Sequence, residues 1–98
     1  MGKPGTAKHR KVVREIRIGN KLGLHARPAS LLAKLASKYR ADITVRKGND
    51  EVNAKSIMGI ITLAASRDAM LHFTASGPDA EQALEAIVEL VEGKFGEE

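Results

Sequence analysis

Apolar and polar residues alternate along three segments of the chain, residues 12–18, 41–47 and 70–75. Alternation with a period of two places successive side chains on opposite faces, which predicts three half-buried β-strands. The middle segment is the clearest, because Ala41, Ile43 and Val45 are separated by polar residues. A short fourth strand is expected at 51–53, joined to it as a hairpin by the Gly-Asn-Asp turn at 48–50.

Three further segments carry the pattern of helices. In the first, residues 26–38, the apolar residues fall in one sector of about 140° at 100° per residue, with Ser30 and Lys34 outside it. The second, residues 56–63, is short and begins with Ser56 as its expected N-cap. The third begins near Pro78 and ends at Gly93. The residues expected to face the core are Leu31, Leu32, Leu35, Ala36 and Tyr39 in the first helix, and Ala80, Ala83, Leu84, Ile87, Val88 and Val91 in the third.

The order of these elements is β-α-β-β-α-β-α. Short strands that are partly joined by a hairpin favour an α+β domain with its helices on one face of the sheet. Ninety-eight residues suit a single domain. We place that domain at 12–95, preceded by a flexible basic extension at 1–11.

Composition narrows the classes of protein. The chain contains no cysteine, which excludes a disulfide framework and a thiolate metal site and is typical of a reducing cytoplasm. The sequence has neither an apolar run of about 20 residues, as a membrane span requires, nor the apolar segment of a signal peptide. We therefore expect a cytoplasmic protein that is not inserted in a membrane.

The net charge of +4 comes mostly from the first 17 residues. Such an arm can bind nucleic acid, a membrane surface or an acidic partner, but it can also be a solvated tail, which Gly2, Pro4 and Gly5 favour. A nucleic-acid-binding module is disfavoured, since the chain has only three aromatic residues and none lies in a basic stretch.

Candidate chemistry centres on the sequence Gly-Leu-His-Ala-Arg-Pro-Ala, residues 23–29. Pro28 is tolerated in a first helical turn, so His25 is expected at the N-cap, with the amides of Ala26 and Arg27 free at the positive end of the helix dipole. These amides and the Arg27 guanidinium could hold a phosphoryl group on the His25 ring. The alternative for an isolated His-x-Arg-Pro is a histidine that only caps the helix.

A second motif, Lys-Ser-Ile-Met-Gly at 55–59, decides between these interpretations. With the first motif it resembles the family of HPr, the histidine-containing phosphocarrier protein of the bacterial phosphotransferase system, over residues 12 to 91. The resemblance implies an open-faced β-sandwich, in which a four-stranded antiparallel sheet carries three helices on one face. It also implies a phosphoryl carrier, not an enzyme, with no cofactor and no metal.

The same resemblance implies the partners and the site. His25 would receive the phosphoryl group on Nδ1 from phosphorylated enzyme I and pass it to sugar-specific IIA domains, stabilised by Arg27 and the Ala26 amide. The docking surface would contain Ala26, Ser30, Lys34, Ile57 and Met58. We expect a monomer without direct contact to nucleic acid.

Ser56 carries a second hypothesis. In some relatives the matching serine is phosphorylated by an HPr kinase/phosphorylase, which would connect this protein to a transcriptional regulator. A cap role alone is the alternative. Within the family, a nitrogen-branch regulatory paralogue remains an alternative to the sugar carrier, whereas a serine-only regulatory homologue is disfavoured because His25 and Arg27 are both present.

Overall fold

The computed structural model describes residues 11–97 of the chain. Residues 1–10, most of the expected N-terminal extension, lie outside the described residues. The predicted order β-α-β-β-α-β-α is confirmed, and a short 3-10 helix follows it. The elements are β1 (Lys11–Arg17), α2 (Ala26–Ala36), β2 (Asp42–Lys47), β3 (Asp50–Asn53), α3 (Ile57–Thr62), β4 (Met70–Ser76), α4 (Ala80–Glu92) and η1 (Lys94–Gly96).

The four strands form one antiparallel sheet in the order β1-β4-β2-β3. Phe73 of β4 lies opposite Arg14 of β1 on one side and Val45 of β2 on the other. The predicted hairpin is also confirmed, since Val45 lies opposite Val52 of β3. The two central strands, β4 and β2, are therefore far apart in sequence.

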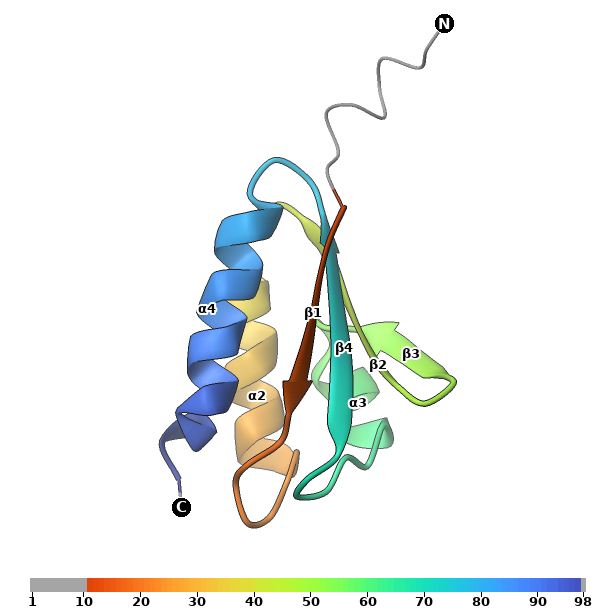
Figure 1. Ribbon diagram of the computed structural model, residues 1–98, viewed down its shortest axis with the longest axis vertical. Helices are drawn as coiled ribbons and strands as arrows, with labels where there is room; N and C mark the ends of the chain where they lie inside the picture. The colour runs from red at the N-terminus through yellow and green to blue at the C-terminus, as the bar shows by residue number, and fades with distance from the viewer. Residues whose placement is uncertain (1–10, 98) are drawn as a thin grey trace, which may run out of the picture.

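The helices cover one face of this sheet, as the open-faced sandwich requires (Figure 1). Helix α4 packs on β1 and β4, whereas α2 packs between α4 and α3. Helix α3 contacts both β3 and α2, so the beginnings of α2 and α3, where the two sequence motifs lie, belong to neighbouring helices. This two-layer arrangement places both sequence motifs on the helical side of the molecule.

The core confirms the strand patterns and corrects one helical pattern. The inward residues of β2 and β4, among them Ile43, Val45 and Phe73, are fully or almost fully buried. In α2 the deeply buried residues include the alanines at 29, 33 and 36 together with Leu32, whereas the expected Leu31, Leu35 and Tyr39 are only partly buried. Alanine carries little weight in a hydrophobic pattern, but its small side chain lets a helix approach its neighbours closely.

The chain reverses after α4. Gly93 caps this helix, as predicted, and Lys94 and Phe95 follow with φ angles of 57° and 55°, in the left-handed region. That conformation costs about 1–2 kcal/mol for each non-glycine residue. Phe95 is only 2% exposed, and burying such a side chain contributes about 1.5–3 kcal/mol. The reversal brings Glu97 back to the loop between β1 and α2.

Candidate functional site

His25 lies at the N-cap of α2, as the sequence predicts. Its backbone is extended, its side chain makes no capping hydrogen bond, and 37% of that side chain is exposed. The carbonyl of His25 accepts the N–H of Ala29 at 3.0 Å and so closes the first helical turn. The N–H groups of Ala26 and Arg27 have no intrahelical acceptor in that turn. The ring and two free backbone donors are therefore at the same positive helix end.

The loop before His25 is held by the segment between α3 and β4. The N–H of Leu24 donates to the carbonyl oxygen of Ala65 at 2.9 Å. Gly23 has φ +70°, and a Cβ atom at this position would come within 2.3 Å of that same oxygen. Only glycine fits such a left-handed, closely packed position. The glycine of the first motif thus sets the place of the histidine two residues later.

The side-chain carboxylate of Glu97 contacts both His25 and Arg27 of the first motif. Glu97 lies 3.3 Å from Nε2 of His25 through either of its oxygens. Arg27 donates from Nη1 to Oε2 of Glu97 at 3.0 Å and to the carbonyl oxygen of Phe95 at 3.2 Å. The expected Arg27 guanidinium is therefore beside His25, and it binds an anion there.

Asn20 is the third donor to Glu97. Its Nδ2 donates to Oε1 of Glu97 at 3.0 Å and to the carbonyl oxygen of Gly23 at 2.8 Å. The residue is fully buried, and within residues 11–97 its Oδ1 atom has no hydrogen-bond partner. Asn20 therefore ties the carboxylate to the glycine turn of the motif.

The surroundings of Glu97 favour its charged form. Burial alone would raise the pKa of this carboxyl. Hydrogen bonds from Asn20, His25 and Arg27 and the attraction of His25 outweigh that effect, so the pKa lies below its ordinary value. At neutral pH the site holds an internal carboxylate, which is an anion that a helix N-terminus and an arginine can stabilise.

Sequence reasoning missed Asn20, Phe95 and Glu97. Asn20 lies in a stretch that we expected to be an ordinary loop, and Glu97 lies 72 residues from His25. The isolated aromatic residue after the helix stop at Gly93 was the one usable signal, because an exposed phenylalanine next to charged residues would be unfavourable. No local pattern marks which group its burial brings to the site.

Ser56 is the N-cap of α3, as predicted. Its Oγ accepts the N–H of Gly59 at 3.0 Å, and the residue is half-buried. The two apolar residues that follow are exposed, Ile57 by 41% and Met58 by 69%. Exposed apolar side chains on a six-residue helix form part of a surface that a partner can cover.

The other predicted docking residues lie on α2. Ala26 and Lys34 are exposed, and Ser30 is half-buried. Since α2 packs against α3, both predicted parts of the surface belong to adjacent helices. The structure adds Leu22, which is 70% exposed in the loop before His25.

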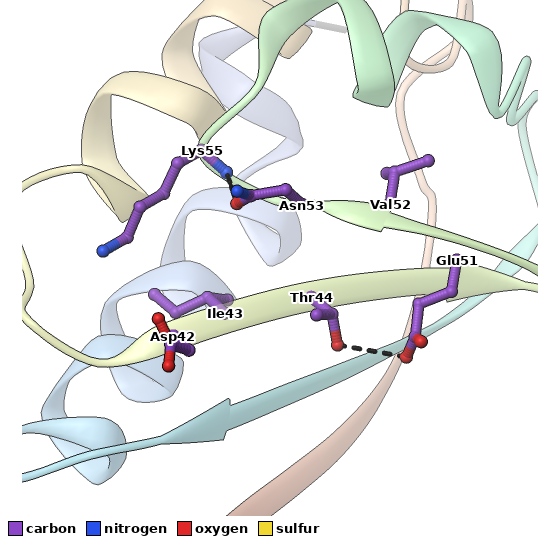
Figure 2. Close-up of a pocket in the computed structure, with 7 residues that line it drawn as sticks. All are labelled: Asp42, Ile43, Thr44, Glu51, Val52, Asn53 and Lys55. Carbon is purple, nitrogen blue, oxygen red and sulfur yellow. Dashed lines mark hydrogen bonds between the residues drawn. The ribbon is translucent and has the colours of Figure 1, made fainter.

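A hollow in the described part of the surface lies away from this site. It has a volume of about 260 Å³ and lies along β2 and β3 (Figure 2). Thr44 donates to Glu51 at 3.2 Å on its lining, and Lys55 directs Nζ to the carbonyl oxygen of Tyr39 at 2.8 Å. Neither His25 nor Arg27 lines this hollow.

Among residues 11–97 no group of three or more His, Asp or Glu side chains could hold a metal ion. No helix in this part of the chain is long and apolar enough to cross a membrane.

Comparison with known proteins identifies the family. A family model described as "PTS HPr component phosphorylation site" matches residues 12–93. The chain belongs to the HPr family. Phosphocarrier protein HPr of Treponema pallidum is 42% identical over 87 residues, which cover 89% of this chain and 99% of that protein.

Other relatives agree on the family and differ in name. Phosphocarrier protein NPr of Shewanella violacea is also 42% identical over 87 residues, covering 89% of this chain and 96% of that protein. The crystal structure of HPr-C-His from Thermoanaerobacter tengcongensis is 50% identical, with a TM-score of 0.83, and covers 91% of this chain and 98% of that one. This HPr-family protein is therefore a phosphocarrier of the phosphotransferase system with the HPr fold.

Proposed function

We propose that His25 of this HPr-family protein accepts a phosphoryl group from phosphorylated enzyme I and passes it to IIA domains for sugar uptake in the cytoplasm. The observation that carries this proposal is the partly exposed His25 ring at the N-terminus of α2, with Arg27 beside it. A ring nitrogen can act as a nucleophile while the helix end and the guanidinium stabilise the charge of the phosphoryl oxygens.

In phosphoryl transfer the protein mainly positions the reacting groups and stabilises the charge on the phosphoryl oxygens. The lone pair of Nδ1 forms the N–P bond, and the bond between phosphorus and the donor breaks with its electron pair going to the donor. The N–H groups of Ala26 and Arg27 are available to the equatorial oxygens because neither has an intrahelical acceptor. Arg27 has further N–H groups besides the Nη1 that binds Glu97 and Phe95.

Partner docking is assigned to the adjacent surfaces of α2 and α3. Ile57 and Met58 supply exposed apolar area, and Ala26, Ser30 and Lys34 lie on the neighbouring helix. Arg27 and Lys34 give this surface a basic edge. An apolar centre with a basic edge suits brief contacts with acidic partners, because charge complementarity mainly raises the rate of association.

We assign to Ser56 a regulatory phosphorylation by an HPr kinase/phosphorylase, acting on a transcriptional regulator through the modified protein. Its Oγ lies at a helix N-terminus, where a phosphate adds roughly −1.5 to −2 charges that the dipole tolerates. The same phosphate would lie next to Ile57 and Met58 on the docking surface. Modification would therefore change partner binding and leave the fold intact.

The acceptor is tested by labelling. The purified protein is incubated with enzyme I and radioactive phosphoenolpyruvate, and acid-labile phosphate is measured. His25→Ala is expected to abolish labelling while its circular dichroism spectrum stays that of the wild type. His72→Ala is the matched control, because His72 is a half-buried histidine of β4 that pairs with Glu15 at 3.3 Å. Undiminished acid-labile label on His25→Ala would remove His25 from the proposal.

The branch is tested in the same assay. Relatives named HPr and NPr are equally identical to this chain, so labelled protein is offered separately to a sugar-specific IIA domain and to a nitrogen-branch IIA domain. Faster transfer to the sugar-specific domain is the expected result. Faster transfer to the nitrogen-branch domain would establish the regulatory paralogue instead.

A further inference from the structure

The contact between Glu97 and His25 is not needed to explain how a phosphoryl group is bound at this site. Both oxygens of the carboxylate lie 3.3 Å from Nε2 of the ring, and the carboxylate is 19% exposed. Asn20 and Arg27 bind the same group at 3.0 Å each. Three donors thus surround one carboxylate, and hydrogen bonds to a charged group are stronger than those between neutral groups.

We propose that Glu97 is a positioning residue for the phosphoryl acceptor, in that its carboxylate accepts the N–H of Nε2 and thereby orients the His25 ring with the lone pair on Nδ1. This inference rests on the proposed role of His25. The physical reason is that a neutral imidazole carries one proton, so the nitrogen that donates to a carboxylate leaves the other one unprotonated. A buried carboxylate plays the equivalent part in hydrolytic triads.

The same contact helps the step itself. When Nδ1 forms the N–P bond, the donor leaves with the electron pair of its own bond to phosphorus, and the proton stays on Nε2. The ring therefore gains positive charge as the bond forms. The Glu97 carboxylate lies next to the nitrogen that keeps the proton, so attraction between the two grows toward the transition state.

The fold holds Glu97 in this position through its neighbours. Phe95, buried in the core, anchors the segment after α4, and its carbonyl oxygen accepts a hydrogen bond from Arg27 at 3.2 Å. Asn20 joins the carboxylate to the Gly23 turn. The ring, the turn and the segment after α4 are thus connected through one carboxylate.

A competing role makes the opposite prediction. If the carboxylate merely occupied the place of the incoming phosphoryl group, its removal would speed up phosphoryl acceptance. If it positions the ring, its removal slows acceptance. The sign of the effect separates the two roles.

The experiment compares the wild type with Glu97→Ala, Glu97→Gln and the control Glu89→Gln, which removes an exposed glutamate of α4. Heteronuclear NMR of ¹⁵N-labelled histidine at about pH 8.5, above the ordinary pKa of a free imidazole, reports which ring nitrogen of His25 carries the proton. In the wild type and in Glu89→Gln, the proton is expected on Nε2, with a ring N–H signal protected from exchange. In Glu97→Ala that signal is lost, and part of the proton moves to Nδ1.

Kinetics with phosphorylated enzyme I provide the second readout. Glu97→Ala is expected to lower kcat by about tenfold, which corresponds to about 1.4 kcal/mol, with KM for enzyme I unchanged. Glu97→Gln keeps an acceptor oxygen without the charge and should give an intermediate rate. An unchanged N–H signal in Glu97→Ala, or faster acceptance, would overturn the inference even while His25 is labelled. Failure to label His25 in the wild type would instead overturn the proposed function and leave the NMR result standing.

Discussion

Replacing Ser56 with aspartate separates a structural role of this residue from a regulatory one. Ser56 Oγ accepts the N–H of Gly59 at 3.0 Å and so caps α3, a helix of only six residues. Aspartate is as good an N-cap as serine, and the positive end of the helix dipole also stabilises its negative charge. Ser56→Asp should therefore fold like the wild type, whereas Ser56→Ala should lose about 1 kcal/mol.

The expected changes in stability and in KM decide how small a difference each assay must resolve. For a domain of this size, a loss of about 1 kcal/mol lowers Tm by roughly 4–8 °C, so Ser56→Ala should melt visibly earlier and Ser56→Asp should not. The effect on docking comes from charge. A like charge on a partner about 8 Å away costs about 0.5 kcal/mol at the dielectric constant of water and about 2 kcal/mol at that of a protein surface, or about 2- to 30-fold in KM.

The assay is a thermal melt followed by circular dichroism, together with initial rates of phosphoryl acceptance at several concentrations of this protein. For Ser56→Asp we expect an unchanged melt and a KM for enzyme I that rises within the stated range. Ser56→Ala serves as the control, because it removes the cap without adding charge and should leave KM near the wild-type value. Substantial unfolding of Ser56→Asp would make the serine a structural cap, and an unchanged KM would remove it from the docking surface.

Two further outcomes are expected. Arg27→Lys should slow transfer in both directions of the relay, because a lysine ammonium cannot reproduce the bidentate contact that a planar guanidinium can make with phosphoryl oxygens. Rates equal to those of Arg67→Lys, an exposed control, would speak against this role. In Asp79→Asn the free energy of unfolding, measured by chemical denaturation, should fall less from pH 6 to pH 2 than it does in the wild type. Hydrogen bonds from the backbone of Arg40 and Ala41 outweigh desolvation and lower the pKa of Asp79, so its stabilising effect is present above the ordinary carboxyl pKa and is lost as the pH falls through the lowered value. If the free energy of unfolding falls as steeply with decreasing pH in Asp79→Asn as in the wild type, this assignment is contradicted.

The helices, the strands and the first motif could be predicted from the sequence. Alternation in β2 and β4 depends only on which face a side chain takes, and the buried Val45 and Phe73 follow from it. The N-caps at His25 and Ser56 also depend on a few adjacent residues, since a helix begins where backbone donors lack acceptors. The local pattern was wrong about how deeply side chains of α2 are buried, because its alanines are more deeply buried than Leu31 and Leu35.

The order of the strands and the completed site were decided by tertiary structure. Residues in β1 and β4 pair across more than fifty positions, and local patterning carries no information on that register. Glu97 reaches His25 because the burial of Phe95 outweighs the cost of two left-handed residues after Gly93, and this balance exists only when the core is assembled. The sequence alone therefore determines where the histidine and the arginine lie on their helix, whereas packing of distant segments determines which carboxylate meets them.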